Sequence, residues 1–125
     1  MATMTFDRTR RGFRTIMGTG IGEAVAELEA AGADVVGSNC GNGIAAMVEI
    51  AREFRKSTTL PVVIRSNAGL PEMREGKLCY PESPAFFAEK ARELLACGVQ
   101  IIGGCCGTTP EHIGAICGEV MRRSL

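Results

Sequence analysis

The chain alternates short apolar runs with longer segments of helical period, and it does so four times in 125 residues. The short runs predict strands, at 2–6, 33–39, 60–67 and 99–104. Each run is followed by a segment of helical period, at 21–32, 43–57, 84–98 and 110–125. Strands that are joined through helices pair in parallel by right-handed crossovers. The pattern therefore predicts an α/β protein built from four βα units.

The ends of the predicted helices carry their own signals. Gly32 and Gly98 stand where helices commonly end, because glycine adopts the left-handed conformation of that position without strain. Thr109 is a suitable N-cap, and Pro110 fits the first helical position. The stretches between the elements, including the arginine-rich 8–14 and the segment 68–83, are predicted to be solvated loops.

Two architectures fit four consecutive βα units within a single domain, residues 1–125. One is an open four-stranded parallel sheet, and the other is half of an eight-stranded (β/α)8 TIM-type barrel. A half-barrel leaves its first and last strands with unpaired edges, and we expect an apolar patch on the inward strand faces. We therefore expect completion by a second copy, giving a homodimer, or by a separate chain that carries an N-terminal half-barrel.

The composition indicates which partners and which cell compartment are expected for this protein. Lysine and arginine together number 14, as do aspartate and glutamate, so no net charge draws the chain to nucleic acid or to an anionic membrane. No apolar run reaches the length of about 20 residues that spans a membrane, and no secretory leader is recognised. We expect a cytoplasmic protein whose six cysteines are reduced or bound to metal.

Polar side chains with metal-binding potential follow three of the four strands. Cys40 ends the second strand, Asn67 ends the third, and Cys105 and Cys106 follow the fourth. The carboxyl ends of parallel strands open on one face, so these side chains are expected to converge although Cys40 lies 65 residues before Cys105. Three thiols favour zinc, and three protein ligands with a replaceable fourth position are typical of catalytic zinc.

Other interpretations of the cysteines and of the glycine-rich turns remain open at this point. Cys105 and Cys106 could form a vicinal disulfide or a structural or redox pair. The glycine-rich turn beside them could instead cradle phosphate, as turns after the last strands of barrels often do. Cys97 and Cys117 lie in predicted helices and are expected to act as small apolar residues. Cys79 is expected in an exposed loop.

The single histidine, His112, stands in the first turn of the last predicted helix. Such a polar residue at a helix start is usually solvated or takes part in capping the helix. A functional role at the mouth of the strands is the less favoured alternative.

Three motifs, in this order and spacing, resemble the homocysteine S-methyltransferase family: "GSNCGNG" (37–43), "SNAGLP" (66–71) and "GGCCGTTPEHI" (103–113). The opening "MTFD" and "RTIMGT" also resemble the fifth strand and following loop of those barrels. The resemblance implies a (β/α)8 barrel in which this chain supplies units five to eight. It places Cys40, Cys105 and Cys106 at the zinc cysteines, and Asn67 at an asparagine that approaches zinc when substrate is absent. Ser66 departs from the proline of many relatives.

The function that this resemblance implies is zinc-dependent S-methylation of homocysteine or a related small thiol. The zinc would hold the substrate sulfur as a thiolate, which then takes a methyl group from a donor. One candidate for the methyl donor is methylcobalamin supplied by another domain or protein. In the family, much of the pocket for the amino-acid end of homocysteine comes from units one to four, which this chain lacks. Methyltransferase activity is therefore expected once another half-barrel completes the fold, and the alternative is a non-catalytic zinc-binding half-barrel.

Overall fold

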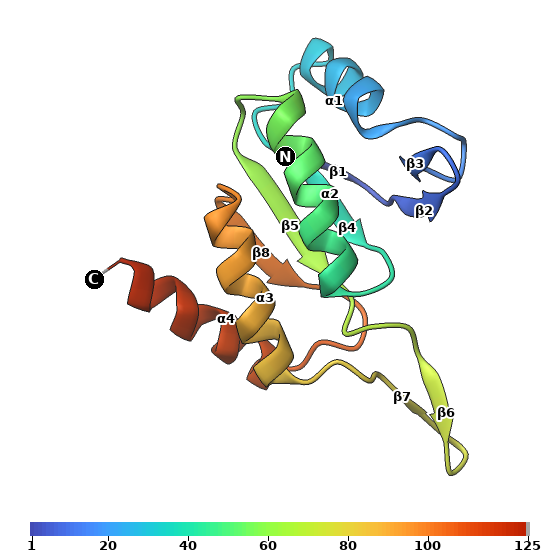
Figure 1. The fold of residues 1–125 in the computed structure, drawn as a ribbon, viewed down its shortest axis with the longest axis vertical. Helices are drawn as coiled ribbons and strands as arrows, with labels where there is room; N and C mark the ends of the chain where they lie inside the picture. The colour runs from blue at the N-terminus through green and yellow to red at the C-terminus, as the bar shows by residue number, and fades with distance from the viewer. Residues whose placement is uncertain (125) are drawn as a thin grey trace.

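The computed structural model of the protein describes residues 1–124 and contains all four predicted βα units (Figure 1). The strands of these units are β1 (Ala2–Met4), β4 (Val36–Cys40), β5 (Val62–Ser66) and β8 (Ile101–Gly104). The helices are α1 (Ile21–Ala30), α2 (Ile44–Ser57), α3 (Pro84–Ala96) and α4 (Pro110–Arg123). The elements match the predicted ones in order and type, with ends that coincide or differ by at most three residues. The last residue of the predicted final helix, Leu125, lies outside the described residues.

The four strands form one parallel sheet in the order β1-β4-β5-β8, which is also their order along the chain. When every crossover has the usual hand, strands added in sequence place their helices on the same face of the sheet. A doubly wound open sheet needs a reversal of strand order, and this sheet has none. The arrangement is therefore consistent with consecutive units of a TIM-type barrel. Within the described residues, no helix is long and apolar enough to cross a membrane.

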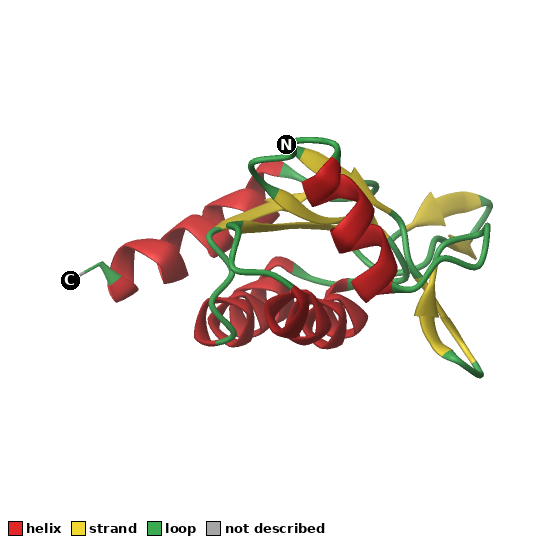
Figure 2. Ribbon diagram, turned by 90° about the horizontal axis from the view of Figure 1, so that it is seen from above, coloured by secondary structure: helices red, strands yellow, loops and turns green. Residues whose placement is uncertain are grey.

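The core lies between this sheet and the helices that cover it (Figure 2). The strand residues Val36, Val62 and Ile64 are fully buried there. Against them packs the apolar stripe of α2, which includes Phe54. The ring of Phe54 meets the ring of Phe6 edge to face, with the centroids 5.6 Å apart. The segment after β1 is thereby tied to the helix that follows Cys40.

The opposite face of the sheet differs from the expectation of a large apolar patch. Side chains alternate along a strand, so this face carries Thr3, Asn39, Val63 and Arg65, with Gly37 and Gly103 among them. Arg65 is exposed, and Ile101 is the one large apolar residue of the four described strands that is exposed by more than a third. The prediction of a large exposed apolar patch was wrong here because most positions of this face are glycine or polar and because Val63 is fully buried.

Exposed apolar side chains gather on α4 instead. Ile113, Val120 and Met121 are 45%, 37% and 61% exposed, and Cys117 is also exposed. Their spacing places them along one stripe of the helix. The helix that follows the last strand therefore carries an apolar stripe that the described residues leave uncovered.

Two antiparallel hairpins stand where loops were predicted. The first pairs β2 (Asp7–Thr9) with β3 (Gly12–Arg14), and the second pairs β6 (Glu72–Arg74) with β7 (Lys77–Cys79). The second turns through Glu75 and Gly76, which both have positive φ, as in the tight turns that suit hairpins. Glutamate is an unusual first residue for such a turn, which explains why the sequence pattern did not reveal it. Both hairpins project on the same side of the molecule (Figures 1 and 2).

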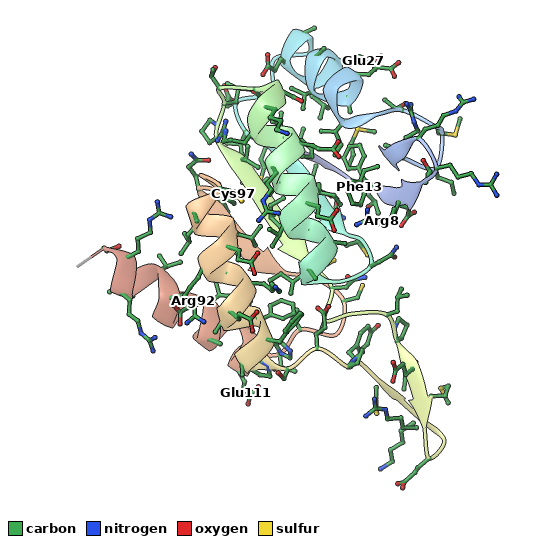
Figure 3. The ribbon with its side chains drawn as sticks, in the orientation of Figure 1. Arg8, Phe13, Glu27, Arg92, Cys97 and Glu111 are labelled. Carbon is green, nitrogen blue, oxygen red and sulfur yellow. The ribbon has the colours of Figure 1, made fainter. Side chains whose placement is uncertain are left out.

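Side-chain contacts anchor the first hairpin to the body of the protein. The guanidinium of Arg8 pairs with the Glu49 carboxylate of α2 at 2.6 Å. It also lies over the ring of Phe13, 4.7 Å from the centroid (Figure 3). The arginine-rich stretch is thus an exposed hairpin rather than a loop, and its first arginine is paired.

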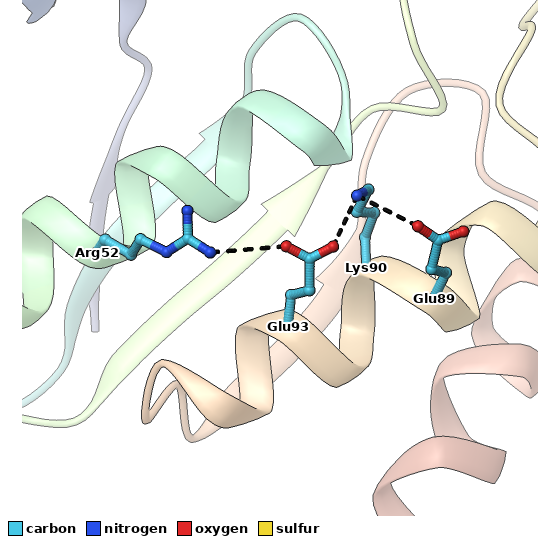
Figure 4. A network of polar contacts seen from close by, with 4 residues as sticks. All are labelled: Arg52, Glu89, Lys90 and Glu93. Atoms are coloured by element: carbon cyan, nitrogen blue, oxygen red, sulfur yellow. Dashed lines mark hydrogen bonds and ion pairs between the residues drawn. The ribbon is translucent and has the colours of Figure 1, made fainter.

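An ion-pair network links α2 to α3 on the surface (Figure 4). Arg52 of α2 lies 3.7 Å from the Glu93 carboxylate of α3, and Lys90 contacts both Glu93 and Glu89, at 2.7 and 3.3 Å. Exposed pairs of this kind contribute at most about 1 kcal/mol each. The network therefore orients the two helices without supplying much of the stability.

Candidate metal centre

The structure brings three thiols together at the carboxyl end of the parallel sheet. The sulfur atoms of Cys40, Cys105 and Cys106 all lie within 4.8 Å of one another. Three thiolates on a tetrahedral zinc ion, with Zn–S bonds of about 2.3 Å, would stand about 3.8 Å apart. All six cysteines are free, so the alternative of a vicinal disulfide is not adopted. The donor set and its spacing both fit a thiolate-ligated zinc ion.

The backbone at Cys40 adopts a conformation that is rare for a residue with a side chain. Its φ is 67°, and Gly41 continues with a φ of 72°. Left-handed conformations at residues other than glycine cost about 1 kcal/mol or more, and they cluster at functional sites. The Cys40 carbonyl accepts a hydrogen bond from the Asn67 N–H at 3.1 Å, which holds this turn against the end of β5.

A tight turn lets the adjacent Cys105 and Cys106 share one site. The Cys105 N–H donates to the Ser66 carbonyl at 2.8 Å, which continues the pairing of β8 with β5. The Cys105 carbonyl then accepts from both the backbone N–H and the hydroxyl of Thr108, at 3.2 and 2.7 Å. The chain leaves the extended conformation here, so the two side chains no longer point to opposite faces.

Asn67 lies between the two cysteine loops. Its side-chain nitrogen donates to the Gly41 carbonyl at 2.9 Å, and its side-chain oxygen accepts from the Cys106 N–H at 3.0 Å. The residue is only 7% exposed. The amide therefore joins the loop after β4 to the loop after β8. That Asn67 serves as a fourth metal ligand stays a prediction.

The crowding of the thiols affects their ionisation. The pKa of Cys106 is raised by its hydrogen bond to Cys105 and by the repulsion that the Cys105 thiolate would exert. Cys40 acts on this pKa in the same direction. Ionisation of Cys106 beside the other two thiols is thus unfavourable without a cation, and a metal bound through Cys106 would have to displace its proton.

His112 is built into the fold rather than into this site. It is 6% exposed, and its Nδ1 accepts the N–H of Thr109 at 3.1 Å. A backbone N–H can only donate, so the proton of the neutral ring lies on Nε2, which donates to the Glu82 carbonyl at 2.7 Å. The ring stands edge-on to Phe87, with centroids 4.9 Å apart. The capping role was predicted correctly, whereas a solvated position is wrong.

The remaining cysteines lie outside the cluster of three thiols. Cys97 is partly buried against the core at the end of α3 (Figure 3), and Cys79 is partly buried in β7. Cys117 was expected to act as a small apolar residue of the last helix, and it is exposed because it lies on the uncovered stripe of α4. Among residues 1–124 the group able to hold a metal consists of Cys40, Cys105 and Cys106.

Glu82 lies near the site, and the sequence pattern predicted no role for it. Its carboxylate accepts the Ile44 N–H at 3.0 Å, at the start of α2. Burial raises the pKa of this carboxyl, and the hydrogen bond from Ile44 opposes that rise. The two residues are 38 positions apart, so no local spacing could have revealed the contact.

Two proteins of known identity are similar in sequence to most of the chain. The chain is 40% identical over 108 residues to methionine synthase of Mycobacterium leprae, strain TN, which covers 86% of this chain. It is 38% identical over 106 residues to methionine synthase of Mycobacterium tuberculosis, strain ATCC 25618 / H37Rv, which covers 84% of this chain. The chain spans 9% of the length of each of these relatives.

The fold also resembles that of a solved structure, the oxidized form of the homocysteine methyltransferase MmuM from Escherichia coli. The match has a TM-score of 0.62 at 28% sequence identity, and it covers 83% of this chain and 31% of that one. The sequence profile of the family described as homocysteine S-methyltransferase matches residues 1–120. With nearly its whole length matched and its three thiols gathered at the strand ends, the chain belongs to the homocysteine S-methyltransferase family.

Proposed function

We propose that this chain provides the zinc-binding, thiol-activating part of a methyltransferase that acts on homocysteine or a related small thiol. The observation that carries the proposal is the convergence of Cys40, Cys105 and Cys106 at the carboxyl end of the parallel sheet. Active sites of barrels built from βα units lie at that end. Membership of the homocysteine S-methyltransferase family supports the reaction class.

The three thiolates would serve as the ligands, and they leave one position of a tetrahedral ion open to the substrate. A zinc ion held there would supply the Lewis acidity that keeps a substrate thiol ionised near neutral pH. The Asn67 amide maintains the separation of the two cysteine loops through its contacts with Gly41 and Cys106. We retain as a prediction that Asn67 leaves these contacts to fill the open position when substrate is absent.

The methyl transfer itself needs a donor with a good leaving group. The substrate sulfur forms a bond to the methyl carbon, and the donor departs with the electron pair of the bond that breaks. Methylcobalamin supplied by another domain or protein is the donor we propose. Because zinc would already hold the substrate sulfur as a thiolate, the proposal assigns no side chain as a general base.

We propose further that residues 1–125 form one domain that requires a second half to complete a barrel. Strands β1 and β8 stand at the two edges of the sheet. The uncovered stripe of Ile113, Cys117, Val120 and Met121 on α4 is suited to packing against another helix. Either a second copy of this chain or a chain carrying the other four units could supply both the missing strands and that helix.

Metal content of cysteine variants tests the site. Cys40→Ser, Cys105→Ser and Cys106→Ser should each weaken zinc binding severely, because each removes one of three ligands. Cys97→Ser and Cys117→Ser are matched controls and should retain one zinc per chain. Full zinc occupancy in the Cys105→Ser, Cys106→Ser double variant would contradict the site.

X-ray absorption of the zinc-loaded protein tests the reaction class. At saturating homocysteine we expect one additional sulfur neighbour at the metal. An unchanged sulfur count in a zinc-replete sample would instead support the second candidate, a zinc-binding half-barrel without catalysis. Arg65 is exposed on the sheet face opposite the helices, and this observation favours the second candidate.

Native mass tests the assembly. Light scattering at micromolar concentration should give about twice the chain mass of 13.2 kDa if two copies close the barrel. Val120→Lys on the α4 stripe should reduce that mass, whereas Met17→Lys, at a residue that is 87% exposed, should not. A cooperative 13.2 kDa monomer that is unaffected by either change would contradict self-closure.

A further inference from the structure

Residues 80–82 cross the loops that carry the thiols, and we call this segment the strap. At its first residue, the Tyr80 ring packs directly on Gly107, which follows Cys106 in the chain. A Cβ added at Gly107 would overlap the ring. The loop after β8 therefore approaches the strap as closely as its backbone permits.

The other two residues of the strap make the same kind of contact with two further loops. A Cβ added at Gly69, after β5, would lie 2.8 Å from the Pro81 side chain. A Cβ added at Gly43, after β4, would overlap the Glu82 carboxylate. Three consecutive residues thus pack on three glycines, one from each loop that carries a predicted site residue.

Hydrogen bonds fasten the strap at its Glu82 end. The Glu82 carboxylate accepts the Ile44 N–H at 3.0 Å, and the Glu82 N–H donates to the Ala68 carbonyl at 3.0 Å. The Glu82 carbonyl accepts from His112 Nε2 at 2.7 Å. These contacts reach the start of α2, the loop after β5 and the start of α4. Each is short and in part shielded from water, where hydrogen bonds to ordered groups are costly to lose.

We propose that the strap is a positioning element that sets the separation of the Cys40, Cys105 and Cys106 thiols. This inference rests on the proposed metal site. The strap acts through the backbone, because Gly107 adjoins Cys106 and Gly43 lies three residues after Cys40. Groups that orient metal ligands in this indirect way commonly change metal affinity by about 10- to 100-fold.

The test compares two glycines that have nearly the same backbone conformation. Gly107 has a φ of +77°, and Gly76 in the β6–β7 hairpin has a φ of +74° with nothing within 4 Å of an added Cβ. Gly107→Ala and Gly76→Ala therefore carry similar backbone strain, and only Gly107→Ala disturbs the strap. Both are made in a chain whose Cys79, Cys97 and Cys117 are replaced by serine.

The primary measurement uses arsenite on metal-free protein, because trivalent arsenic binds three thiolates that lie close together. We expect Gly107→Ala to weaken arsenite binding by about ten-fold or more and Gly76→Ala to change it by less than about two-fold. Equal arsenite affinity in the two variants overturns the proposal. Urea midpoints of both variants establish that any difference does not come from unfolding.

Zinc titrations of the same variants distinguish failure of this inference from failure of the proposed function. Failure of the parent chain to bind zinc would contradict the proposed function. A difference in arsenite binding between the two glycine variants would still support the positioning role of the strap. Full zinc binding together with identical arsenite affinities would contradict only the positioning role of the strap. The two failures are thus distinguishable.

Two further variants test the hydrogen-bonded end of the strap. Glu82→Gln keeps an oxygen that can accept the Ile44 N–H, whereas Glu82→Ala removes it. We expect Glu82→Ala to weaken arsenite binding and Glu82→Gln to restore it to near the parent value. Equal losses in both variants would contradict positioning through this hydrogen bond.

Discussion

The side-chain oxygen of Asn67 accepts the backbone N–H of Cys106 at 3.0 Å, which engages an atom that could otherwise approach a metal. On the other side of the same amide, the nitrogen donates to the Gly41 carbonyl at 2.9 Å. A residue that the sequence marked as a possible ligand therefore also holds the two cysteine loops together. The two roles make opposite predictions for one substitution.

Asn67→Asp should weaken zinc binding if the amide acts as a brace. The new oxygen would face the Gly41 carbonyl, so a hydrogen bond becomes a repulsive contact in a site that is 7% exposed. We expect the free energy of unfolding of the metal-free protein to fall by about 1–3 kcal/mol in urea denaturation. Zinc affinity, measured by competition with a chelator, should fall by about ten-fold or more.

The control for this substitution is Asn39→Asp, which adds the same charge at the carboxyl end of β4. The Asn39 side chain makes no hydrogen bond within residues 1–124, so little change in stability is expected. If Asn67 is instead a ligand whose contacts are dispensable, Asn67→Asp should bind zinc at least as tightly as the parent, because a carboxylate is also a zinc ligand. That outcome would contradict the role of Asn67 in holding the two cysteine loops together.

Zinc affinity should rise steeply with pH. A thiol with the ordinary pKa of 9.0 already keeps its proton at neutral pH, and the hydrogen bond to Cys105 and the charge of any neighbouring thiolate raise the pKa of Cys106 further. Binding must release that proton, so each increase in pH toward the raised pKa favours the bound state. Calorimetry in buffers of different ionisation enthalpy measures the number of protons released. An affinity that is independent of pH would contradict this account.

Glu82→Gln should alter the pH dependence of stability above the ordinary glutamate pKa of 4.5. Burial raises the pKa of Glu82 in the folded protein, so the folded state binds its proton more tightly than the unfolded state does. This contribution is fully present below pH 4.5 and is lost as the pH rises through the raised value. The glutamine variant should lack that loss, as measured by urea unfolding across the acidic range.

The matched control is Glu111→Gln, for which the sign is reversed. A hydrogen bond from Thr109 lowers the pKa of the exposed Glu111, at the first turn of α4 (Figure 3). Its contribution is present above pH 4.5 and is lost as the pH falls through the lowered value. Indistinguishable pH profiles for the two variants would contradict both assignments.

Phe54→Ala should destabilise the protein strongly, because the ring is fully buried against Phe6. Removing a buried phenylalanine side chain typically costs about 3–5 kcal/mol of unfolding free energy. Ile16→Ala, at a residue that is 96% exposed, should cost less than about 0.5 kcal/mol. Chemical denaturation measures both, and similar losses in the two variants would contradict the packing described.

The sequence by itself determined the four βα units and the place where the thiols meet. Short apolar runs identified the strands, and the helical period of apolar residues identified the helices, because burial of one helix face requires that period. Parallel pairing then followed from the helical connections, and it forces every strand to end at the same edge. Cys40 and Cys105 could therefore be placed together from the sequence alone, although 65 residues separate them.

Only the tertiary structure decided which groups surround those thiols and how exposed each one is. Cys117 was expected to act as a small apolar residue and is exposed, because helical periodicity does not say whether a neighbouring element covers a given stripe of a helix. The contact of Glu82 with Ile44 and that of Tyr80 with Gly107 depend on the path of a loop across three others. Contacts of this kind join residues that are 27 to 38 positions apart in the chain. They depend on how closely two backbone segments approach and on what buries them, and neither produces a periodic pattern in the sequence.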